Sequence, residues 1–306
     1  MKITFLGTGT SQGIPVISCK CAVCSSDDPK DNRLRTSVLV ETHDKTVVID
    51  SGPDFRYQML RAGAQDLDAI VFTHEHKDHI AGLDDIRPFN YLLKKNIDIY
   101  ADVRVQAALK REFSYIFSEV KYPGLPQINL HDISQEPFAI GETLWIPIEV
   151  MHYKLPILGY RINDFAYITD AKTVSHASIE KLRGVKVLVV NALQLATHIS
   201  HFNLEQALAF AKEVGAEITY LTHVSHNLGL HEEVEKELPD NVRIAYDGLQ
   251  IVVYKFKFFD GNCLISIYLQ AKYPGGEIGR RAILRGWCSK GRGSSNLLPG
   301  TNQIHG

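Results

Sequence analysis

Short apolar segments rich in β-branched residues recur along the first 254 residues and predict most of the strands. Residues 2–6 alternate, and residues 36–41 and 46–50 are β-branched runs joined by His43-Asp44-Lys45, which is typical of a hairpin. Further apolar runs predict strands at residues 69–72, 144–150, 157–168, 185–190, 217–222, 242–246 and 249–256. Several of these strands end directly before a histidine or an aspartate.

Helical periodicity is clearest between residues 203 and 214. Leu204, Ala207, Leu208 and Ala211 fall on one face, and Asn203 stands where an N-cap is expected. Shorter helices are predicted near residues 54–61, 104–117 and 175–183. Because strands are followed by helices, we expect a layered α/β architecture.

Composition and charge divide the chain near residue 256. Residues 1–254 carry 25 Lys+Arg and 33 Asp+Glu, a net charge of -8, whereas the remaining residues carry eight basic and two acidic side chains, a net charge of +6. We therefore expect a folded domain at residues 1–256 and a basic, disordered tail at residues 257–306. The acidic body makes nucleic acid an unlikely partner, because the phosphate backbone requires basic surfaces.

The tail has two open interpretations. It is either a short basic arm for anionic partners, or the result of translating a downstream transfer-RNA gene as if it were coding sequence. Cys263 and Cys288 lie within it and receive no role. Elsewhere no apolar run approaches the roughly 18 residues of a membrane span, and the N-terminus does not resemble a signal peptide. We therefore expect a cytoplasmic protein with no membrane partner.

The segment Thr73-His74-Glu75-His76-Lys77-Asp78-His79 carries the chemistry. Alternate residues at a strand end point the same way, so His74 and His76 can share one ion. Asp78 and His79 follow one turn later and can face a second ion. Imidazole and carboxylate ligands together suit Zn²⁺ or Mn²⁺.

One motif cannot complete two coordination shells, so further ligands must come from later strand ends. Three residues fit this position: His152, Asp170 and His223. Asp50, at the end of its own strand, is a candidate for orienting an imidazole, with a simple turn before Ser51-Gly52 as the alternative.

In this order the ligands resemble the metallo-β-lactamase superfamily across residues 1 to about 254. The resemblance implies a four-layer αββα sandwich, the metallo-β-lactamase fold. It also implies that His74, His76 and His152 bind one divalent metal ion, that Asp78, His79 and His223 bind the other, and that Asp170 bridges them. Such a pair of ions activates water and neutralises a phosphoryl group.

The segment Cys19-Lys20-Cys21-Ala22-Val23-Cys24 offers three thiolates in a tight knuckle, with buried free thiols as the alternative. With the opening Gly7-Thr8-Gly9-Thr10-Ser11-Gln12-Gly13 and the ending Thr222-His223-Val224-Ser225-His226, it resembles the phosphoribosyl cyclic phosphate phosphodiesterases of phosphonate breakdown. That resemblance implies a structural Zn²⁺ bound by Cys19, Cys21, Cys24 and His226.

The same resemblance assigns a catalytic role to Asp78 and His201, where His201 helps to protonate the leaving oxygen from a pKa near 6.5. The expected partner is a small-molecule phosphodiester substrate, a cyclic phosphate on a phosphorylated sugar, in a protein that could form a homodimer. The Gly7–Gly13 loop and Arg35 are weak candidates for holding a substrate phosphate. The remaining histidines match no motif and are interpreted as surface residues: His43, His131, His176, His198 and His231.

Three alternatives stay open. A ribonuclease Z-like endonuclease shares the metal motif but would need an extended basic arm, which residues 1–254 do not show. A glyoxalase-type thioesterase or lactonase has no reason to carry the cysteine knuckle. A non-catalytic member of the fold, such as a coenzyme-biosynthesis protein, would have a degenerate metal motif, whereas all seven ligand positions are filled here.

Overall fold

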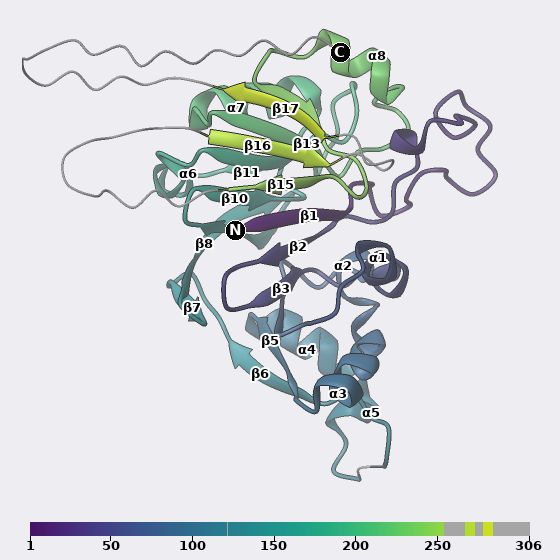
Figure 1. Ribbon diagram of the computed structural model, residues 1–306, viewed down its shortest axis with the longest axis vertical. Coiled ribbons are helices and arrows are strands. Elements are labelled where there is room, and N and C mark those ends of the chain that lie inside the picture. The colour runs from purple at the N-terminus through teal and green to yellow at the C-terminus, as the bar shows by residue number, and fades with distance from the viewer. Residues whose placement is uncertain (121, 254–266, 273–277, 284–306) are drawn as a thin grey trace, which may run out of the picture.

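The computed structural model describes residues 1–120, 122–253, 267–272 and 278–283, and shows two sheets packed face to face (Figure 1). The first sheet has the order β15 (Gln250–Val252), β1 (Lys2–Gly7), β2 (Ser37–Glu41), β3 (Thr46–Ile49), β4 (Ala69–Val71), β5 (Ile97–Ala101) and β6 (Ile128–Asp132). The second has the order β11 (Thr173–Val174), β8 (Thr143–His152), β9 (Leu155–Ile162), β10 (Phe165–Ile168), β12 (Val187–Asn191), β13 (Ile218–Thr222) and β14 (Val242–Ile244), with β7 (Phe138–Ile140) paired to β8.

Three apolar clusters show how the layers are held together. One cluster lies between the two sheets and includes Phe5, Trp145 and Tyr160, all fully buried. A second joins the outer face of the first sheet to its helices: α1 (Phe55–Ala62), α2 (Lys77–Ile80), α3 (Arg87–Leu93), α4 (Val103–Glu112), α5 (Ser114–Phe117) and the 3₁₀ turn Leu83–Ile86. The third joins the second sheet to α6 (His176–Leu182), α7 (Leu204–Val214) and α8 (His231–Glu237). The predicted αββα sandwich is confirmed.

Helix α7 matches its sequence signal closely. The Asn203 side chain accepts a hydrogen bond from the Gln206 N–H, and the Gln206 side chain bonds back to the Asn203 N–H, which completes a capping box. Gly215, with φ of 71°, ends the helix in the left-handed conformation. This helix fixes the position of the loop before it, which carries His201.

Two predicted elements are divided in the structure. The predicted strand 157–168 turns back at Asn163, whose φ is 54°, and becomes the antiparallel pair β9 and β10. Both strands are apolar because both are buried, so the turn between them is not visible in the hydrophobic pattern. The predicted helix 104–117 is interrupted at Phe113 (φ -118°), which separates α4 from α5.

The predicted tail contains regular structure. Within it, β16 (Ile267–Lys272) and β17 (Ile278–Ile283) pair antiparallel, and β16 lies beside β15 (Figure 1). The expectation of a disordered tail stays a prediction, and these two strands are the part of the tail that the structure describes. Cys263 and Cys288 lie outside the described residues, and the domain boundary at residue 256 stays a prediction. No helix in the described part of the chain has the length and apolarity needed to cross a membrane.

Candidate metal centre

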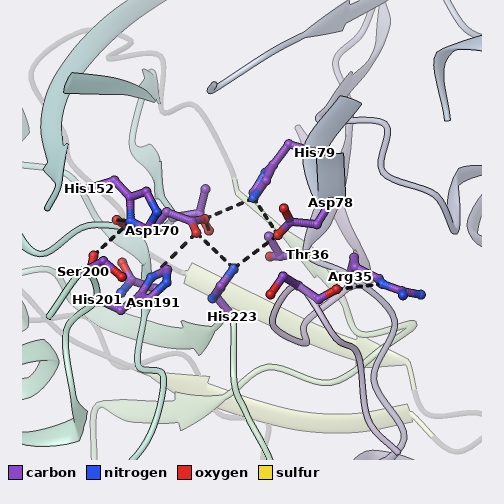
Figure 2. A network of polar contacts seen from close by, with 12 residues as sticks. Arg35, Thr36, Asp78, His79, His152, Asp170, Asn191, Ser200, His201 and His223 are labelled. Carbon is purple, nitrogen blue, oxygen red and sulfur yellow. Dashed lines mark hydrogen bonds and ion pairs between the residues drawn. The ribbon is translucent and has the colours of Figure 1, made fainter. Parts of the chain in front are cut away.

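The seven predicted ligands come from the ends of strands in both sheets. After β4 the chain delivers His74 and His76, and α2 then presents Asp78 and His79. From the second sheet, β8 ends at His152, whereas Asp170 follows β10 and His223 follows β13. Figure 2 shows Asp78 and His79 facing Asp170 and His223, with dashed lines marking the contacts between them.

Three of the strands that reach this centre end in a left-handed residue. The φ angles are 63° at Asp50, 58° at Asp170 and 53° at His223. Such a conformation is unfavourable for residues other than glycine and is found where surrounding structure enforces it. Each of these three side chains contacts another member of the cluster: Asp50 and Asp170 contact His79, and His223 contacts Asp170.

Close backbone contact places α2 against the loop after β3. A Cβ on Gly52 would lie 2.1 Å from the Asp78 carbonyl oxygen, and a Cβ on Gly82 would lie 2.1 Å from the Gly52 carbonyl oxygen. Neither position accepts a side chain without a shift of the backbone. Glycine at these two positions therefore sets the position of Asp78 and His79.

Asp170 lies at the middle of the cluster. Its Oδ2 is 3.3 Å from the Nε2 of His79, and its Oδ1 is 3.1 Å from the Nε2 of His223 and 3.6 Å from the Nδ1 of His201. Asp78 Oδ2 lies 3.2 Å from His79 Nε2 and 3.9 Å from His223 Nε2. Asp170 also shares groups of nearby potential ligand atoms with His74 and with His152, so it lies between the two predicted sets of ligands.

The imidazoles of His74, His76 and His152 gather on the other side. Their ring centroids are 4.6 Å apart for His74 and His76, 5.1 Å for His76 and His152, and 5.7 Å for His74 and His152. His152 Nδ1 donates to the carbonyl oxygens of Asp170, at 3.1 Å, and Ser200, at 3.0 Å, which leaves Nε2 as its candidate ligand atom.

Four groups of potential ligand atoms within 4.8 Å of one another occur among the described residues: His74, His79 and Asp170; Asp78, His79 and His223; His152, Asp170 and His201; and Cys19, Cys21, Cys24 and His226. His76 belongs to none of these groups and joins the centre through ring contacts with His74 and His152 and through the charges of neighbouring residues, Asp78 and Asp170 among them.

Burial and charge oppose each other at the centre. Burial alone would lower the pKa of His79, but the carboxylates of Asp78, Asp170 and Asp50 outweigh it and raise that pKa well above its ordinary value. Burial likewise opposes Asp170 and Asp78 at His223, whose pKa rises to about 9. The carboxylates therefore create a field that favours positive charge in a place closed to water.

Several imidazole nitrogens lack a hydrogen-bond partner despite this burial. They are His74 Nε2, His79 Nε2 and both ring nitrogens of His223, for which no described residue makes a hydrogen bond, although the carboxylates of Asp78 and Asp170 lie within ion-pair distance of His79 Nε2 and His223 Nε2. An unsatisfied polar atom in a protein interior is costly. Orphaned imidazole nitrogens beside buried carboxylates match the ligand chemistry of divalent transition metals. The residues present therefore fit the metal ions that the sequence predicts.

Supporting hydrogen bonds orient these side chains. His79 Nδ1 donates to Asp50 Oδ2 at 2.7 Å, and Asp50 also accepts from the N–H and the hydroxyl of Thr73, each at 2.8 Å. The Asp50 contact matches the sequence hypothesis. Sequence reasoning missed Asn191, whose side chain accepts from the Ala171 N–H at 2.7 Å and donates to its carbonyl at 3.0 Å. Asn191 thereby holds the backbone directly after Asp170, and only its place at the end of an apolar strand pointed to it.

The cysteine knuckle closes around His226. The Nδ1 of His226 lies 3.3 Å from the Sγ of Cys19, 3.5 Å from that of Cys21 and 3.4 Å from that of Cys24. A backbone hydrogen bond from Cys24 is the main reason that the pKa of Cys21 falls to about 6. Three sulfurs and one imidazole nitrogen are the donor set of a closed, tetrahedral zinc site.

Comparison with known proteins identifies the family. A family model described as the beta-lactamase superfamily domain matches residues 45–224, more than half of the chain. The chain belongs to the metallo-β-lactamase superfamily. Its structural neighbours place it among the metal-dependent hydrolases of this fold, for which divalent metal ions are characteristic.

Three relatives show the range of this superfamily. A crystal structure titled as a new diphosphatase from the PhnP family has a TM-score of 0.78 and 41% identity, covering 83% of this chain and 98% of that one. An octanoyltransferase of Porphyromonas gingivalis is 38% identical over 256 residues, which is 83% of this chain but 52% of that protein, so the chain spans about half its length. A ribonuclease Z of Mycobacterium sp. is 24% identical, over 73% of this chain and 84% of that protein.

Several residues differ from the sequence expectation. His201 is buried, which lowers its pKa to about 3, so its imidazole is neutral at pH 7 and does not keep the ordinary value of about 6.5. His198, expected at the surface, lies with its ring centroid 5.2 Å from that of His201. His231, also expected at the surface, is buried and accepts a hydrogen bond from Arg33 at 3.1 Å.

The expected phosphate candidates are occupied by internal contacts. The Arg35 guanidinium pairs with Asp54 at 3.0 Å and donates to the Ser11 carbonyl at 3.1 Å. In the glycine-rich loop, the N–H groups of Gly9 and Gly13 donate to Leu34 and Thr10. The amide of Thr10 donates to Val224, next to His223. This loop therefore contacts the segment that carries His223 through its backbone. Its glycines allow the loop backbone to lie close to the backbone of Arg33 and Arg35.

Proposed function

We propose that this protein is a metal-dependent phosphodiesterase that opens a cyclic phosphate diester on a phosphorylated sugar to the monoester. The observation that carries the proposal is the convergence of five imidazoles and two carboxylates from both sheets, together with the cysteine knuckle. The 41% identity to a PhnP-family diphosphatase supports substrates with a bond to phosphorus. The exact sugar is set by loops that carry no motif.

In this proposal His74, His76 and His152 hold one divalent ion, zinc or manganese. Asp78, His79 and His223 would hold the second, and Asp170 would bridge the two. When bound, such a pair of ions lowers the pKa of water to about 7 and neutralises charge on a phosphoryl group. Asp50, through His79, and the carbonyls of Ser200 and Asp170, through His152, keep the imidazole rings in position.

His201 is the proposed partner of the leaving oxygen. It lies in the loop before α7, faces Asp170 and is almost fully buried. Because its imidazole is neutral at pH 7, His201 donates an N–H hydrogen bond to the leaving oxygen. The leaving oxygen takes its proton either from water or from this N–H, and in the second case the imidazole regains a proton from solvent. This differs from an imidazolium acid, which would require an ordinary pKa.

The knuckle is proposed to bind one structural zinc ion. Its four donors come from two segments more than 200 residues apart in sequence, and Cys19 Sγ lies 3.3 Å from His226 Nδ1. The zinc would therefore join the N-terminal loop to the segment that also carries His223.

Ribonuclease Z activity is the second candidate, because relatives of that name cover most of the chain at 24% identity. The net charge of -8 over residues 1–254 weakens it, because binding of RNA depends on contacts between basic side chains and phosphates. A catalytically inactive member of the fold would also be consistent with the fold alone.

Turnover against a substrate panel tests these alternatives. The panel contains bis-p-nitrophenyl phosphate, cyclic phosphate sugars, a sugar diphosphate, a precursor tRNA and a thioester, each assayed with added Zn²⁺ or Mn²⁺. We expect the highest kcat/KM for a cyclic phosphate sugar. Preferential cleavage of the precursor tRNA or the thioester would contradict the proposal. A chain with one zinc ion and no turnover of any substrate would support the inactive alternative.

A further inference from the structure

The side chain of His198 is held in one orientation by the residue two positions later. The backbone N–H of Ser200 donates to His198 Nδ1 at 3.3 Å, and the Ser200 hydroxyl lies 3.2 Å from the same nitrogen. A backbone N–H can only donate, so Nδ1 must be the acceptor. In the neutral ring the proton therefore lies on Nε2, which makes that atom a hydrogen-bond donor.

Ser200 also connects His198 to the metal centre. Its carbonyl oxygen accepts from Nδ1 of His152, the contact drawn in Figure 2, while its N–H and hydroxyl orient His198. One short segment thus holds a predicted metal ligand and a second imidazole at once. The His198 ring is next to that of His201, with centroids 5.2 Å apart.

The free nitrogen of His198 has no partner within the part of the chain that the structure describes. The ring is half-buried, and its Nε2 is not among the buried atoms that lack a hydrogen bond. Burial, and then the charge of Lys172, lower the pKa of His198, which is in keeping with a neutral ring. A neutral, oriented N–H that lies beside the candidate catalytic residue is well placed to meet an acceptor on a ligand.

We infer that His198 is a substrate-binding residue whose Nε2–H donates to a phosphoryl oxygen of the substrate, on the His201 side of the metal centre. The inference rests on the proposed function, because it assumes a phosphoryl group at this centre. It adds a non-metal contact that distinguishes phosphorylated substrates from esters with no charged oxygen at this position. The competing interpretation is that the hydrogen bonds of Ser200 to His198 only close the loop before α7.

Steady-state kinetics of three variants separate these interpretations. His198→Phe keeps the ring shape without the donor, His198→Gln keeps a donor near the position of Nε2, and His176→Phe removes an exposed histidine on α6 as the matched control. For a phosphodiester substrate we expect KM to rise about tenfold or more in His198→Phe, with a smaller change in kcat. We expect substantial recovery in His198→Gln and no change in His176→Phe. Equal kinetic constants for His198→Phe and the control would overturn the inference.

A binding experiment decides the point without turnover. Long-range ¹H–¹⁵N spectra of the metal-loaded full chain report which nitrogen of each imidazole carries the proton, and the signals lost in His198→Gln assign this residue. We expect the Nε2–H tautomer for His198 and a shift of its Nε2 signal on addition of inorganic phosphate. A protonated Nδ1, or no phosphate-dependent shift while phosphate binds elsewhere at the centre, would refute the role. If the wild type binds phosphate through His198 but hydrolyses no phosphodiester, the proposed function fails and the binding site stands.

Discussion

His79 Nδ1 lies 2.7 Å from Asp50 Oδ2, and neither side chain has any exposure to solvent. The contact fixes which nitrogen of His79 is protonated and directs the other, Nε2, toward Asp78 and Asp170. Burial raises the pKa of Asp50, and the charge of His79 opposes that rise. The pair therefore links ligand geometry to charge at the second metal position.

Asp50→Asn tests this link. The amide cannot supply the negative charge that orients His79, so we expect the affinity of the second ion to fall about 10–100-fold. Metal content by plasma mass spectrometry after dialysis, and recovery of turnover with added metal, measure the effect. Thr73→Val removes one hydroxyl contact to Asp50 and should weaken binding less. Unchanged metal content in Asp50→Asn would show that His79 is oriented by its surroundings alone.

His76→Ala and Asp78→Ala address the catalytic centre directly. Each removes a proposed ligand of a different ion, so we expect turnover to fall to the background rate while far-ultraviolet circular dichroism stays unchanged. His176→Ala, an exposed change on α6, is the control. Full activity in His76→Ala would exclude His76 as a ligand, and the test is informative because His76 lies in none of the groups of closely spaced potential ligand atoms.

Cys21→Ala should act on stability. A closed zinc site contributes binding free energy directly to folding, so we expect the Tm to fall by on the order of 10 °C. The zinc content should fall by one ion per chain. Ser25→Ala, an exposed change in the same loop, should leave both unchanged. A Cys21→Ala protein with unaltered zinc content would mean that the knuckle holds no metal.

His231 should make stability depend on pH. Burial and then the charge of Arg33 lower its pKa to about 3 in the folded state, against about 6.5 when unfolded. The unfolded chain therefore binds more protons, and stability is lost as the pH falls from about 6.5 toward 3. Between pH 7.5 and pH 5 the contribution is about 2 kcal/mol.

Urea denaturation of wild type and His231→Asn at both pH values measures this contribution. Asparagine keeps an acceptor for Arg33 but does not titrate, so the variant should lose less stability on acidification. The difference between the two proteins cancels the titration of the metal ligands. Parallel losses in both would assign the acid sensitivity to other groups.

The domain boundary can be tested by truncation. If residues 1–256 form the catalytic domain, a chain that ends at Phe258 should retain the kcat/KM of the full chain. Size-exclusion chromatography and turnover under matched metal loading measure this. A loss of activity would mean that the segment containing β16 and β17, beside β15, supports the first sheet.

The residues that converge at the candidate metal centre could be predicted because their chemistry is local. His74, His76, Asp78 and His79 lie in one motif, and a strand end directs each later ligand toward the same edge of the sheets. The groups around them were less visible. His198 and His231 looked like surface residues because burial depends on which loops pack over them, and a lone histidine in sequence carries no sign of that. The turn at Asn163 was hidden in the same way, between two strands that are both apolar.

The ligands on the two sides of the centre come from different sheets, with Asp78 and His79 on the first and Asp170 and His223 on the second. If these residues are the ligands, ions would bind there only when the two halves are paired as in the native state, since neither half holds a complete set. Metal availability during synthesis should therefore influence how much chain reaches the folded form, because ligands that bind only the native state shift the folding equilibrium by mass action. In a cell short of the metal we therefore expect a lower amount of folded protein as well as a lower turnover rate per molecule.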